Sequence, residues 1–261
     1  MAIKAFNKEY EDIYKYPLSG QKDVYKVTDE DNIYILKIVC FNEINEIERS
    51  YREAEFLKNM KHEGYFPEIY NIQISFSEKK FYILEEYIEG NTLEIEKNNY
   101  KGREKKVIQL LYKLVIGMSE LWENNIVHRD LKPSNIIIKP NGDPVILDLG
   151  IAKFLDLSPL TLSEKMPYSN YYFAPEQYKN LGHLISERTD FFVLGILTYE
   201  LYTGEHPFNR ENNNLLNGIY KETGNKNFDI LISKLLKVQP YERFRTYEDF
   251  EEYLEEYLKL L

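Results

Sequence analysis

The residues best suited to chemistry stand in one short stretch, 128–135, and at one position after it. In this stretch Asp130 is followed by Lys132 and Asn135, and Asp148 comes further along the chain. A carboxylate can orient an attacking hydroxyl and accept its proton, while a lysine beside it neutralises charge on a moving phosphate. An amide oxygen and a second carboxylate are hard ligands of the kind that Mg²⁺ prefers. The pattern indicates phosphoryl transfer, in which Asp130 and Lys132 are catalytic and Asn135 and Asp148 bind metal.

This stretch also carries a family resemblance. Its sequence, His-Arg-Asp-Leu-Lys-Pro-Ser-Asn, followed by Asp-Leu-Gly at 148–150, resembles the catalytic loop and metal-binding motif of the eukaryotic-type (Hanks-type) serine/threonine protein kinases. Leu149 stands where phenylalanine is commoner in that family. An amphipathic segment that merely ends in a polar turn would not need this order of residues. The resemblance implies ATP and Mg²⁺ (or Mn²⁺) as cofactors, and serine or threonine hydroxyls of proteins as substrates.

The composition limits the class of protein. The chain has 261 residues, of which 43% are hydrophobic and 15% aromatic, enough for a sizeable core in one large domain or two lobes. Its net charge of −10 argues against electrostatic binding of nucleic acid. No apolar run approaches the length of a membrane span, so we expect no association with a membrane. One cysteine, Cys40, rules out an internal disulfide and fits a cytoplasmic protein.

Hydrophobic periodicity predicts strands in the first third of the chain and mainly helices after it. The predicted strands cover about residues 24–27, 34–39, 68–75 and 81–87, and the predicted helices about 43–60, 103–125, 189–202 and 247–261. With the resemblance, this order implies an α+β, two-lobed protein-kinase-like fold, with a small antiparallel-sheet N-lobe with one main helix and a larger, mainly helical C-lobe. We expect a single protein kinase domain over residues 1–261, with the N-lobe at about 1–87, the hinge at about 86–90 and the C-lobe at about 91–261. Ligands favour the cleft between two such lobes.

Lys37 lies between two apolar residues of a predicted strand, so its side chain faces opposite to theirs. A strand exposed to water alternates in the same way, but Lys37 also precedes an acidic helix and the catalytic stretch. It resembles the kinase lysine that holds the α- and β-phosphates of ATP. The family pairs this lysine with a helix glutamate, for which Glu53 and Glu55 are the candidates. Glu53 fits better, because Leu57 can pack beneath it, whereas Glu55 would place Asn59 there.

The loop expected to cover the phosphates departs from the family pattern. Three spaced glycines of that pattern are replaced by Pro17, Ser19 and Lys22, and Gly20 is the one glycine before Val24. Proline has a fixed φ and no N–H, so this loop offers one donor fewer. The resemblance places Ser19, Gly20, Lys22 and Val24 at the nucleotide. The Lys22 ammonium could donate to phosphate, or it could be a solvated loop lysine.

Residues 81–88 resemble the strand and hinge whose backbone binds adenine in the family. The Glu86 carbonyl and the Ile88 N–H would be the two binding groups. Glu85 falls at the back of the adenine pocket, where an apolar residue is more usual. Because a buried, unpaired carboxylate is costly, we expect Glu85 to be partnered, or neutral and hydrogen-bonded.

Other motifs predict scaffold contacts. Glu176, in Ala-Pro-Glu, resembles the family glutamate that pairs with a buried arginine, here Arg243. Asp190 would bind backbone N–H groups of the catalytic loop. His128 is expected to pack and hydrogen-bond beneath that loop rather than to transfer protons.

Residues 151–170 are expected to form the activation loop. We predict autophosphorylation at Thr161, Ser158 or Ser163, which would order the loop through charge-assisted hydrogen bonds. Arg129 and Lys153 would form the basic pocket that receives the phosphate. The alternative is a loop that is ordered without modification.

Three functions compete. The first is an active serine/threonine protein kinase, because Lys132 directly after Asp-Leu is the serine/threonine form of the motif. The second is a pseudokinase or scaffolding module, which the glycine-poor loop suggests. The third is a small-molecule phosphotransferase related to antibiotic and choline kinases. As a rule those enzymes lack residues equivalent to Lys132 and Pro133, and they lack the Ala-Pro-Glu segment. The sequence indicates neither the physiological substrate nor the oligomeric state.

Overall fold

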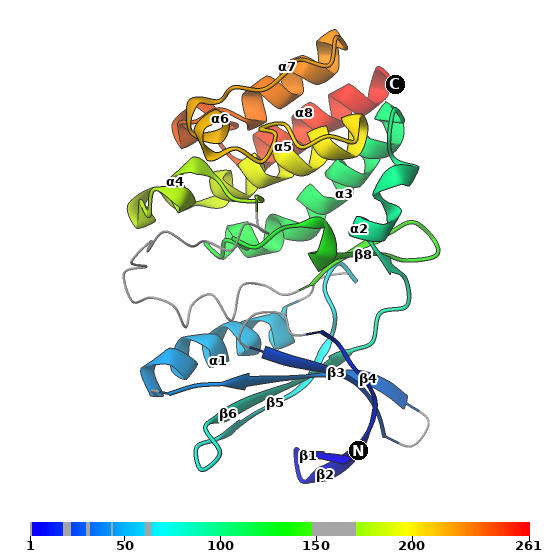
Figure 1. The fold of residues 1–261 in the computed structure, drawn as a ribbon, viewed down its shortest axis with the longest axis vertical. Coiled ribbons are helices and arrows are strands. Elements are labelled where there is room, and N and C mark those ends of the chain that lie inside the picture. The colour runs from blue at the N-terminus through cyan, green and yellow to red at the C-terminus, as the bar shows by residue number, and fades with distance from the viewer. Residues whose placement is uncertain (1, 18–21, 30–31, 43, 61–63, 148–170) are drawn as a thin grey trace. The chain divides into compact units, whose positions relative to one another are not determined.

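The computed structural model describes the chain except for residues 1, 18–21, 30–31, 43, 61–63 and 148–170 (Figure 1). The described residues divide into two compact units, one up to Glu89 and the other from Gly90 onward. The first unit is built on a sheet and the second mainly on helices. This distribution of strands and helices confirms the α+β class expected from the periodicity.

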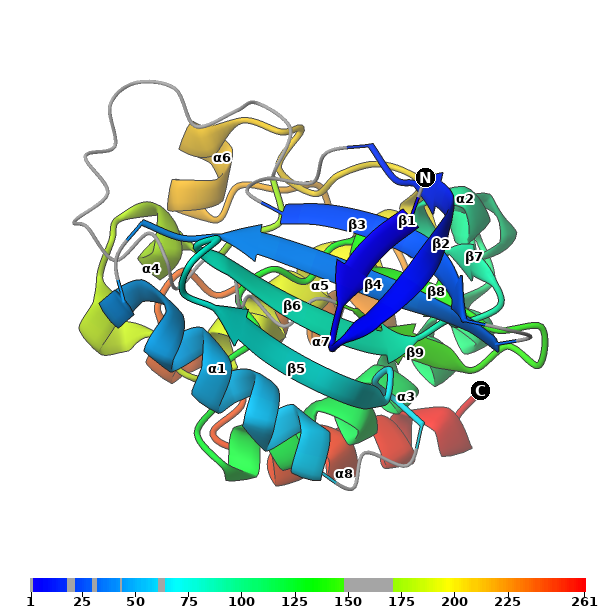
Figure 2. The same ribbon diagram turned by 90° about the horizontal axis from the view of Figure 1, so that it is seen from below.

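The first unit contains a six-stranded antiparallel sheet with the strand order β1-β2-β3-β4-β6-β5 (Figure 2). Its strands are β1 (Ala2–Ala5), β2 (Lys8–Lys15), β3 (Lys22–Asp29), β4 (Asn32–Cys40), β5 (Ile69–Ser75) and β6 (Lys80–Glu86). Helix α1 (Ile44–Asn59) follows β4 and packs against β5. The last four strands and α1 lie where the sequence predicted them, whereas β1 and β2 were not predicted.

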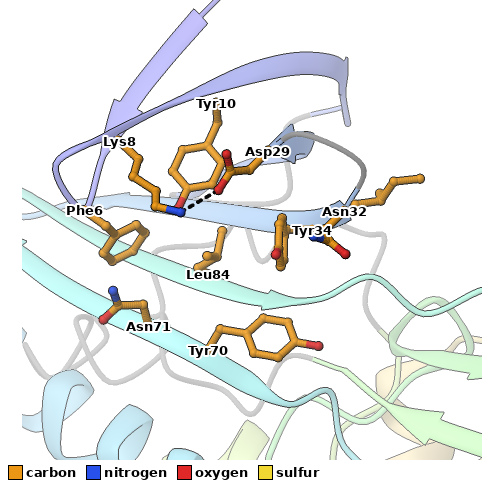
Figure 3. A pocket seen from close by; sticks show the side chains of 10 residues that line it. Phe6, Lys8, Tyr10, Asp29, Asn32, Tyr34, Tyr70, Asn71 and Leu84 are labelled. Atoms are coloured by element: carbon orange, nitrogen blue, oxygen red, sulfur yellow. Dashed lines mark hydrogen bonds and ion pairs between the residues drawn. The ribbon is translucent and has the colours of Figure 1, made fainter.

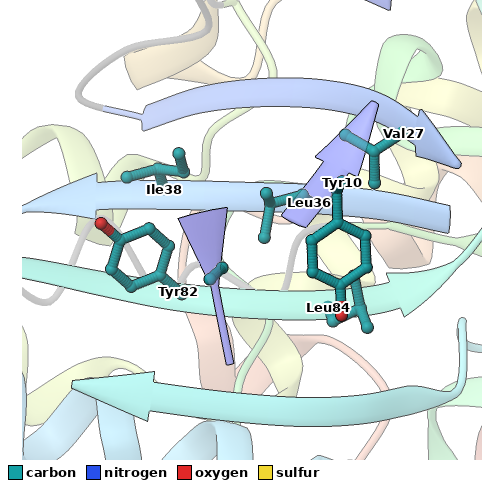
Figure 4. Close-up of a cluster of buried hydrophobic side chains, with 7 residues drawn as sticks. Tyr10, Val27, Leu36, Ile38, Tyr82 and Leu84 are labelled. Carbon is teal, nitrogen blue, oxygen red and sulfur yellow. The ribbon is translucent and has the colours of Figure 1, made fainter. Parts of the chain in front are cut away.

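The hairpin of β1 and β2 covers one face of this sheet and buries a hydrophobic cluster there (Figure 4). The buried cluster comprises Ala5, Tyr10, Val27, Leu36, Ile38, Tyr82 and Leu84. Successive side chains of a strand point to opposite faces, so Lys37, between Leu36 and Ile38, projects from the other face. The sheet therefore has a packed face under the hairpin and an opposite face that carries Lys37.

The second unit is mainly helical. Its helices are α2 (Leu93–Glu96), α3 (Glu104–Glu123), α4 (Pro175–Tyr178), α5 (Glu187–Thr203), α6 (Asn212–Asn217), α7 (Lys226–Leu235) and α8 (Tyr247–Lys259). It also contains a small antiparallel sheet of β7 (Asn91–Thr92), β8 (Ile136–Ile138) and β9 (Pro144–Ile146), and 3₁₀ turns at Lys97–Asn99, Pro133–Asn135, Gly182–Leu184 and Pro240–Glu242. Helices α3, α5 and α8 confirm the predicted helical segments. Among the described helices, none is long and apolar enough to cross a lipid bilayer.

Helix α5 lies in the core of the second unit and packs against α3 and α7. Thirteen of its seventeen residues are buried, as expected for a helix that is apolar on all sides. Gly195 allows α7 to approach closely, because a Cβ at this position would lie 2.7 Å from the Leu235 Cβ. The first turn of this buried helix carries Asp190, which contacts the backbone of His128 and Arg129.

Candidate active site

The loop that carries the predicted catalytic residues is held by Asp190, in the first turn of α5. The buried Asp190 carboxylate accepts hydrogen bonds from the backbone N–H groups of His128 at 2.8 Å and Arg129 at 3.0 Å. It also accepts one from the Trp122 indole N–H at 3.0 Å. Burial raises the pKa of Asp190, while these three hydrogen-bond donors favour its charged form. The predicted contact between Asp190 and the catalytic loop is confirmed.

Arg129 has a left-handed backbone conformation, with a φ of 64°. This region is unfavourable for a residue with a Cβ, and it persists where surrounding contacts determine the backbone. The Arg129 N–H donates to Asp190, and the Arg129 carbonyl accepts a hydrogen bond from Gln177 Nε2 at 3.1 Å. These two contacts fix the peptide units on both sides of Arg129, and so the start of the segment that carries Asp130.

His128 is fully buried and has contacts on both ring nitrogens, as predicted for a structural residue. Its Nδ1 accepts a hydrogen bond from the Asp130 N–H at 3.3 Å. Nε2 therefore carries the proton, which it donates to the Leu147 carbonyl at 3.2 Å. The Leu147 N–H in turn donates to the Asn135 carbonyl at 2.7 Å. These contacts place Leu147, the residue before Asp148 in the chain, beside Asn135.

Asp130, Lys132 and Asn135 are in direct contact with one another through the Asp130 carboxylate. Its Oδ2 accepts hydrogen bonds from the Lys132 ammonium at 3.0 Å and from Asn135 Nδ2 at 3.1 Å. Asn135 Nδ2 also donates to the Asp130 backbone carbonyl at 2.9 Å. Two donors on one oxygen fix the orientation of the carboxylate. The structure thus brings together three of the residues that the sequence pattern selected for phosphoryl transfer.

The Asn135 side chain fits a role in metal binding. The hydrogen bonds described for it use the amide nitrogen, so Oδ1 is the hard oxygen that suits a divalent cation. The second predicted ligand, Asp148, is not among the described residues. Within the described ranges, no group of three or more His, Cys, Asp or Glu residues is placed to hold a metal ion.

In the first unit, Lys37 forms a buried ion pair with Glu85. On the neighbouring strands β4 and β6, Lys37 pairs in register with Ile83 and Glu85 with Ile35, which puts the two charged side chains diagonally opposite on one face. Lys37 Nζ lies 2.5 Å from Glu85 Oε2, and the two side chains are 10% and 7% exposed. The expectation that Glu85 has a partner is confirmed.

Other residues predicted to bind nucleotide lie in the same unit as this pair, and Val24 lies beside Lys37. Val24 pairs in register with Lys37 across β3 and β4, so both side chains project from the same face. Lys22 is the first residue of β3 and is half-buried. Glu86 ends β6, and the buried Ile88 follows it.

Several predicted residues lie outside the part of the chain that the structure describes. They are Ser19, Gly20, Asp148, the side chain of Glu53 in α1, and the segment 151–170 with Lys153, Ser158, Thr161 and Ser163. The pairing of Lys37 with Glu53 and the phosphorylation sites therefore stay predictions.

The predicted ion pair between Glu176 and Arg243 is confirmed. The guanidinium donates from Nη1 to Oε1 at 2.7 Å and from Nη2 to Oε2 at 2.9 Å, and both side chains are buried. The Thr189 hydroxyl donates to the same carboxylate at 2.9 Å. This two-pronged geometry is the strongest form of a carboxylate–arginine contact, and it fixes the segment at Glu176 to the start of α5.

The sequence did not indicate two other contacts in the second unit. The Tyr172 hydroxyl donates to the buried Glu200 carboxylate of α5, and burial together with Glu200 raises the pKa of Tyr172. Gln177 in α4 donates to the catalytic loop at Arg129. A glutamate inside an otherwise apolar helix is the sequence signal that could have indicated the first contact, because a buried carboxylate needs a partner. No comparable signal marks Gln177.

A pocket of about 440 Å³ lies on the hairpin side of the first unit (Figure 3). Its walls include Tyr34, Tyr70 and the ion pair of Lys8 with Asp29, whose Nζ and Oδ2 are 2.8 Å apart. Leu84, on the face of β6 under the hairpin, also lines it, so the sheet separates the pocket from Lys37. Among the residues that the structure describes, none of those predicted to do chemistry lines this pocket.

Known proteins resemble this chain over most of its length. The family model described as "Protein kinase domain" matches residues 20–256. The serine/threonine-protein kinase PrkC of Bacillus subtilis is 31% identical over 250 residues, which cover 89% of this chain and 38% of that protein. The probable serine/threonine-protein kinase PknB of Lactococcus lactis is 30% identical over 213 residues, covering 78% of this chain and 33% of that protein. The chain thus spans well under half the length of these relatives.

Proposed function

Because this chain belongs to the protein kinase family, we propose that it is an active, ATP-dependent serine/threonine protein kinase. It transfers the γ-phosphate of ATP to serine and threonine hydroxyls of protein substrates and of its own chain. The observation that carries the proposal is the contact of the Asp130 carboxylate with both Lys132 and Asn135. Relatives named serine/threonine-protein kinases support the choice of these hydroxyls.

In this proposal Asp130 orients the substrate hydroxyl and takes up its proton as the oxygen attacks the γ-phosphorus. The bond between the γ-phosphorus and the bridging oxygen breaks, and ADP is the leaving group. Lys132, whose Nζ is 3.0 Å from Asp130 Oδ2, neutralises charge on the transferring oxygens. The two donors on Oδ2 keep the carboxylate in one orientation, which favours a single direction of approach for the hydroxyl.

ATP and a divalent cation are the proposed cofactors. Lys37 binds the α- and β-phosphates, and the Glu86 carbonyl and Ile88 N–H bind adenine. The other proposed nucleotide contacts are Ser19, Gly20, Lys22 and Val24. Asn135 and Asp148 would hold Mg²⁺ (or Mn²⁺), which when bound would neutralise phosphate charge. Support comes from the shared face of Val24 and Lys37 and from the side-chain oxygen of Asn135.

The two rival functions have specific weaknesses. A pseudokinase normally lacks some of the reacting residues, whereas Lys37, Asp130, Lys132, Asn135 and Asp148 are all present here. A small-molecule phosphotransferase would not need the Ala-Pro-Glu segment, which the Glu176–Arg243 pair fixes to α5 in this chain. That segment favours a protein substrate over a small molecule.

The test is transfer of labelled γ-phosphate from ATP·Mg²⁺ to the chain itself and to a generic basic protein, followed by identification of the phosphorylated residues. The proposal predicts phosphoserine and phosphothreonine, with labelling reduced by about 10²–10⁴-fold in the Asp130→Asn variant. Binding of ATP without transfer would support a scaffolding module. Transfer to an aminoglycoside or choline, but not to protein, would support the small-molecule phosphotransferase.

The same experiment addresses regulation. We propose that autophosphorylation at Thr161, Ser158 or Ser163 orders the activation loop, with Arg129 and Lys153 as the receiving basic residues. Intact-mass analysis after incubation with ATP·Mg²⁺ should show added phosphate. A fully active enzyme without added mass would reject this part of the proposal.

The proposed location is the cytoplasm. One cysteine in 261 residues supports a reducing compartment such as the cytoplasm.

A further inference from the structure

The ion pair between Lys37 and Glu85 links the lysine proposed to bind phosphates with a residue that has no part in the proposed chemistry. Both side chains are almost completely buried, and the charged atoms are 2.5 Å apart. Taking two charges out of water is costly, and removing either partner leaves the other uncompensated. The ion pair with Glu85 therefore keeps the Lys37 ammonium charged and holds it in one position.

The pair lies entirely within the sheet. Strands β4 and β6 are paired without interruption from Tyr34 with Glu86 to Cys40 with Lys80. The distance between the two backbones at Lys37 and Glu85 is thus fixed by ladder hydrogen bonds on both sides of the pair. Helix α1 is not part of this ladder, and a side chain from α1 would reach Lys37 from a different element.

We propose that Glu85 is a positioning residue for Lys37: it holds Nζ from within the sheet, so that the lysine is in place whether or not a carboxylate of α1 approaches it. This inference rests on the proposed function, because the position of Lys37 Nζ matters only if Lys37 binds nucleotide phosphates. Glu85 has no role of its own in the proposed phosphoryl transfer, and it would act through Lys37.

The chemistry of the two groups indicates that Glu85 positions Lys37 and does not prevent it from binding phosphate. A lysine ammonium has three N–H donors, so a hydrogen bond to Glu85 is compatible with further bonds to phosphate oxygens. The carboxylate also favours the charged form of a buried lysine, which burial alone would disfavour. A neutral residue in place of Glu85 should therefore weaken both the charge and the placement of Nζ.

The experiment compares the Glu85→Gln, Glu85→Asp and Glu53→Gln variants of the whole chain. Asp29→Asn is the matched control, since Asp29 also pairs with a lysine in this sheet, at 2.8 Å from Lys8 on the hairpin side. For each variant, kcat and the KM for ATP are measured in phosphoryl transfer, and ATP affinity by calorimetry. A loss of folded protein alone would lower kcat and leave KM and the affinity per active site unchanged.

We expect Glu85→Gln to reduce kcat/KM for ATP by about 100-fold, mostly through a raised KM, as for a misplaced binding group. Glu85→Asp should fall between Glu85→Gln and the wild type, Glu53→Gln should lose less than Glu85→Gln, and Asp29→Asn should match the wild type. If Glu85→Gln does not fold, the KM of Glu85→Asp for ATP tests the inference, and a value above that of the wild type would support it.

Two results would overturn the inference in an active wild-type protein. One is an unchanged KM for ATP in Glu85→Gln and Glu85→Asp, and the other is a larger loss in Glu53→Gln than in Glu85→Gln. A wild-type chain that neither binds ATP nor transfers phosphate would instead refute the proposed function. The two failures are therefore distinguishable.

Discussion

Arg243 and Glu176 form two parallel hydrogen bonds, of 2.7 and 2.9 Å, between side chains that are both buried. We predict that Arg243→Met lowers the free energy of unfolding by about 3–5 kcal/mol, because it leaves the Glu176 carboxylate buried and uncompensated. Urea unfolding measures this change. The double variant Arg243→Met with Glu176→Met should lose less than Arg243→Met alone; an equal or greater loss would contradict this electrostatic explanation.

We predict that even a methyl side chain at Gly195 destabilises the protein. A Cβ at Gly195 would lie 2.7 Å from the Leu235 Cβ and 2.9 Å from the Leu236 Cδ2. Although alanine favours helices, Gly195→Ala should lower the free energy of unfolding by about 1–3 kcal/mol through overpacking. Gly182→Ala is the control, because a Cβ at Gly182 meets no atom within 4 Å. Equal unfolding midpoints for the two variants would reject the overpacking.

His206 should make stability depend on pH. Burial lowers the pKa of His206 to about 4, and its Nδ1 accepts hydrogen bonds from the Phe208 and Arg210 N–H groups at 3.3 and 3.4 Å. A histidine of the unfolded chain titrates near 6.5, so between about pH 4 and 6.5 only the unfolded state binds the proton. The stability present above pH 6.5 is therefore lost as the pH falls through this window, by up to about 3 kcal/mol.

The His206→Gln variant isolates this contribution. The difference in unfolding free energy between wild type and variant should grow as the pH rises from about 4 to 6.5 and then level off. Urea unfolding at several pH values measures it. A difference that stays constant across this range would show that His206 does not titrate as its burial implies.

The contacts of the catalytic loop could largely be predicted from the sequence. Asp190, Glu176 and Arg243 are recognisable because the family places them at characteristic spacings, and the buried helix α5 carries Asp190 and the Thr189 that contacts Glu176. His128 was expected beneath the loop, and its ring has the structural contacts of such a residue. The contacts of these buried residues could be predicted because each residue belongs to a short sequence motif of the family.

The N-terminal hairpin could not be predicted in the same way. Tyr10 is 3% exposed, whereas Tyr14, four residues later in the same strand, is 52% exposed. Strict alternation would put both on one face, but a bulge between Asp12 and Tyr14 shifts the register of β2 against β3. The alternation signal is therefore broken at the bulge, in the middle of the paired strand.

The partner of Glu85 also depended on strand register. The sequence required some partner for a buried carboxylate, and did not indicate which residue it would be. A shift of one residue between β4 and β6 would put Lys37 and Glu85 on opposite faces of the sheet. The observed pairing of Ile35 with Glu85 places them together, which only the complete ladder reveals.

The role of Asp130 can be tested most directly by comparing phosphoryl-transfer rates of the wild type and the Asp130→Asn variant at saturating ATP·Mg²⁺. Asparagine retains the shape of Asp130 and loses the charge that accepts the proton. We predict that kcat falls by about 10²–10⁴-fold, the usual contribution of a general base, while ATP affinity stays the same. A variant that keeps the wild-type kcat would contradict the assignment of Asp130 as the catalytic base.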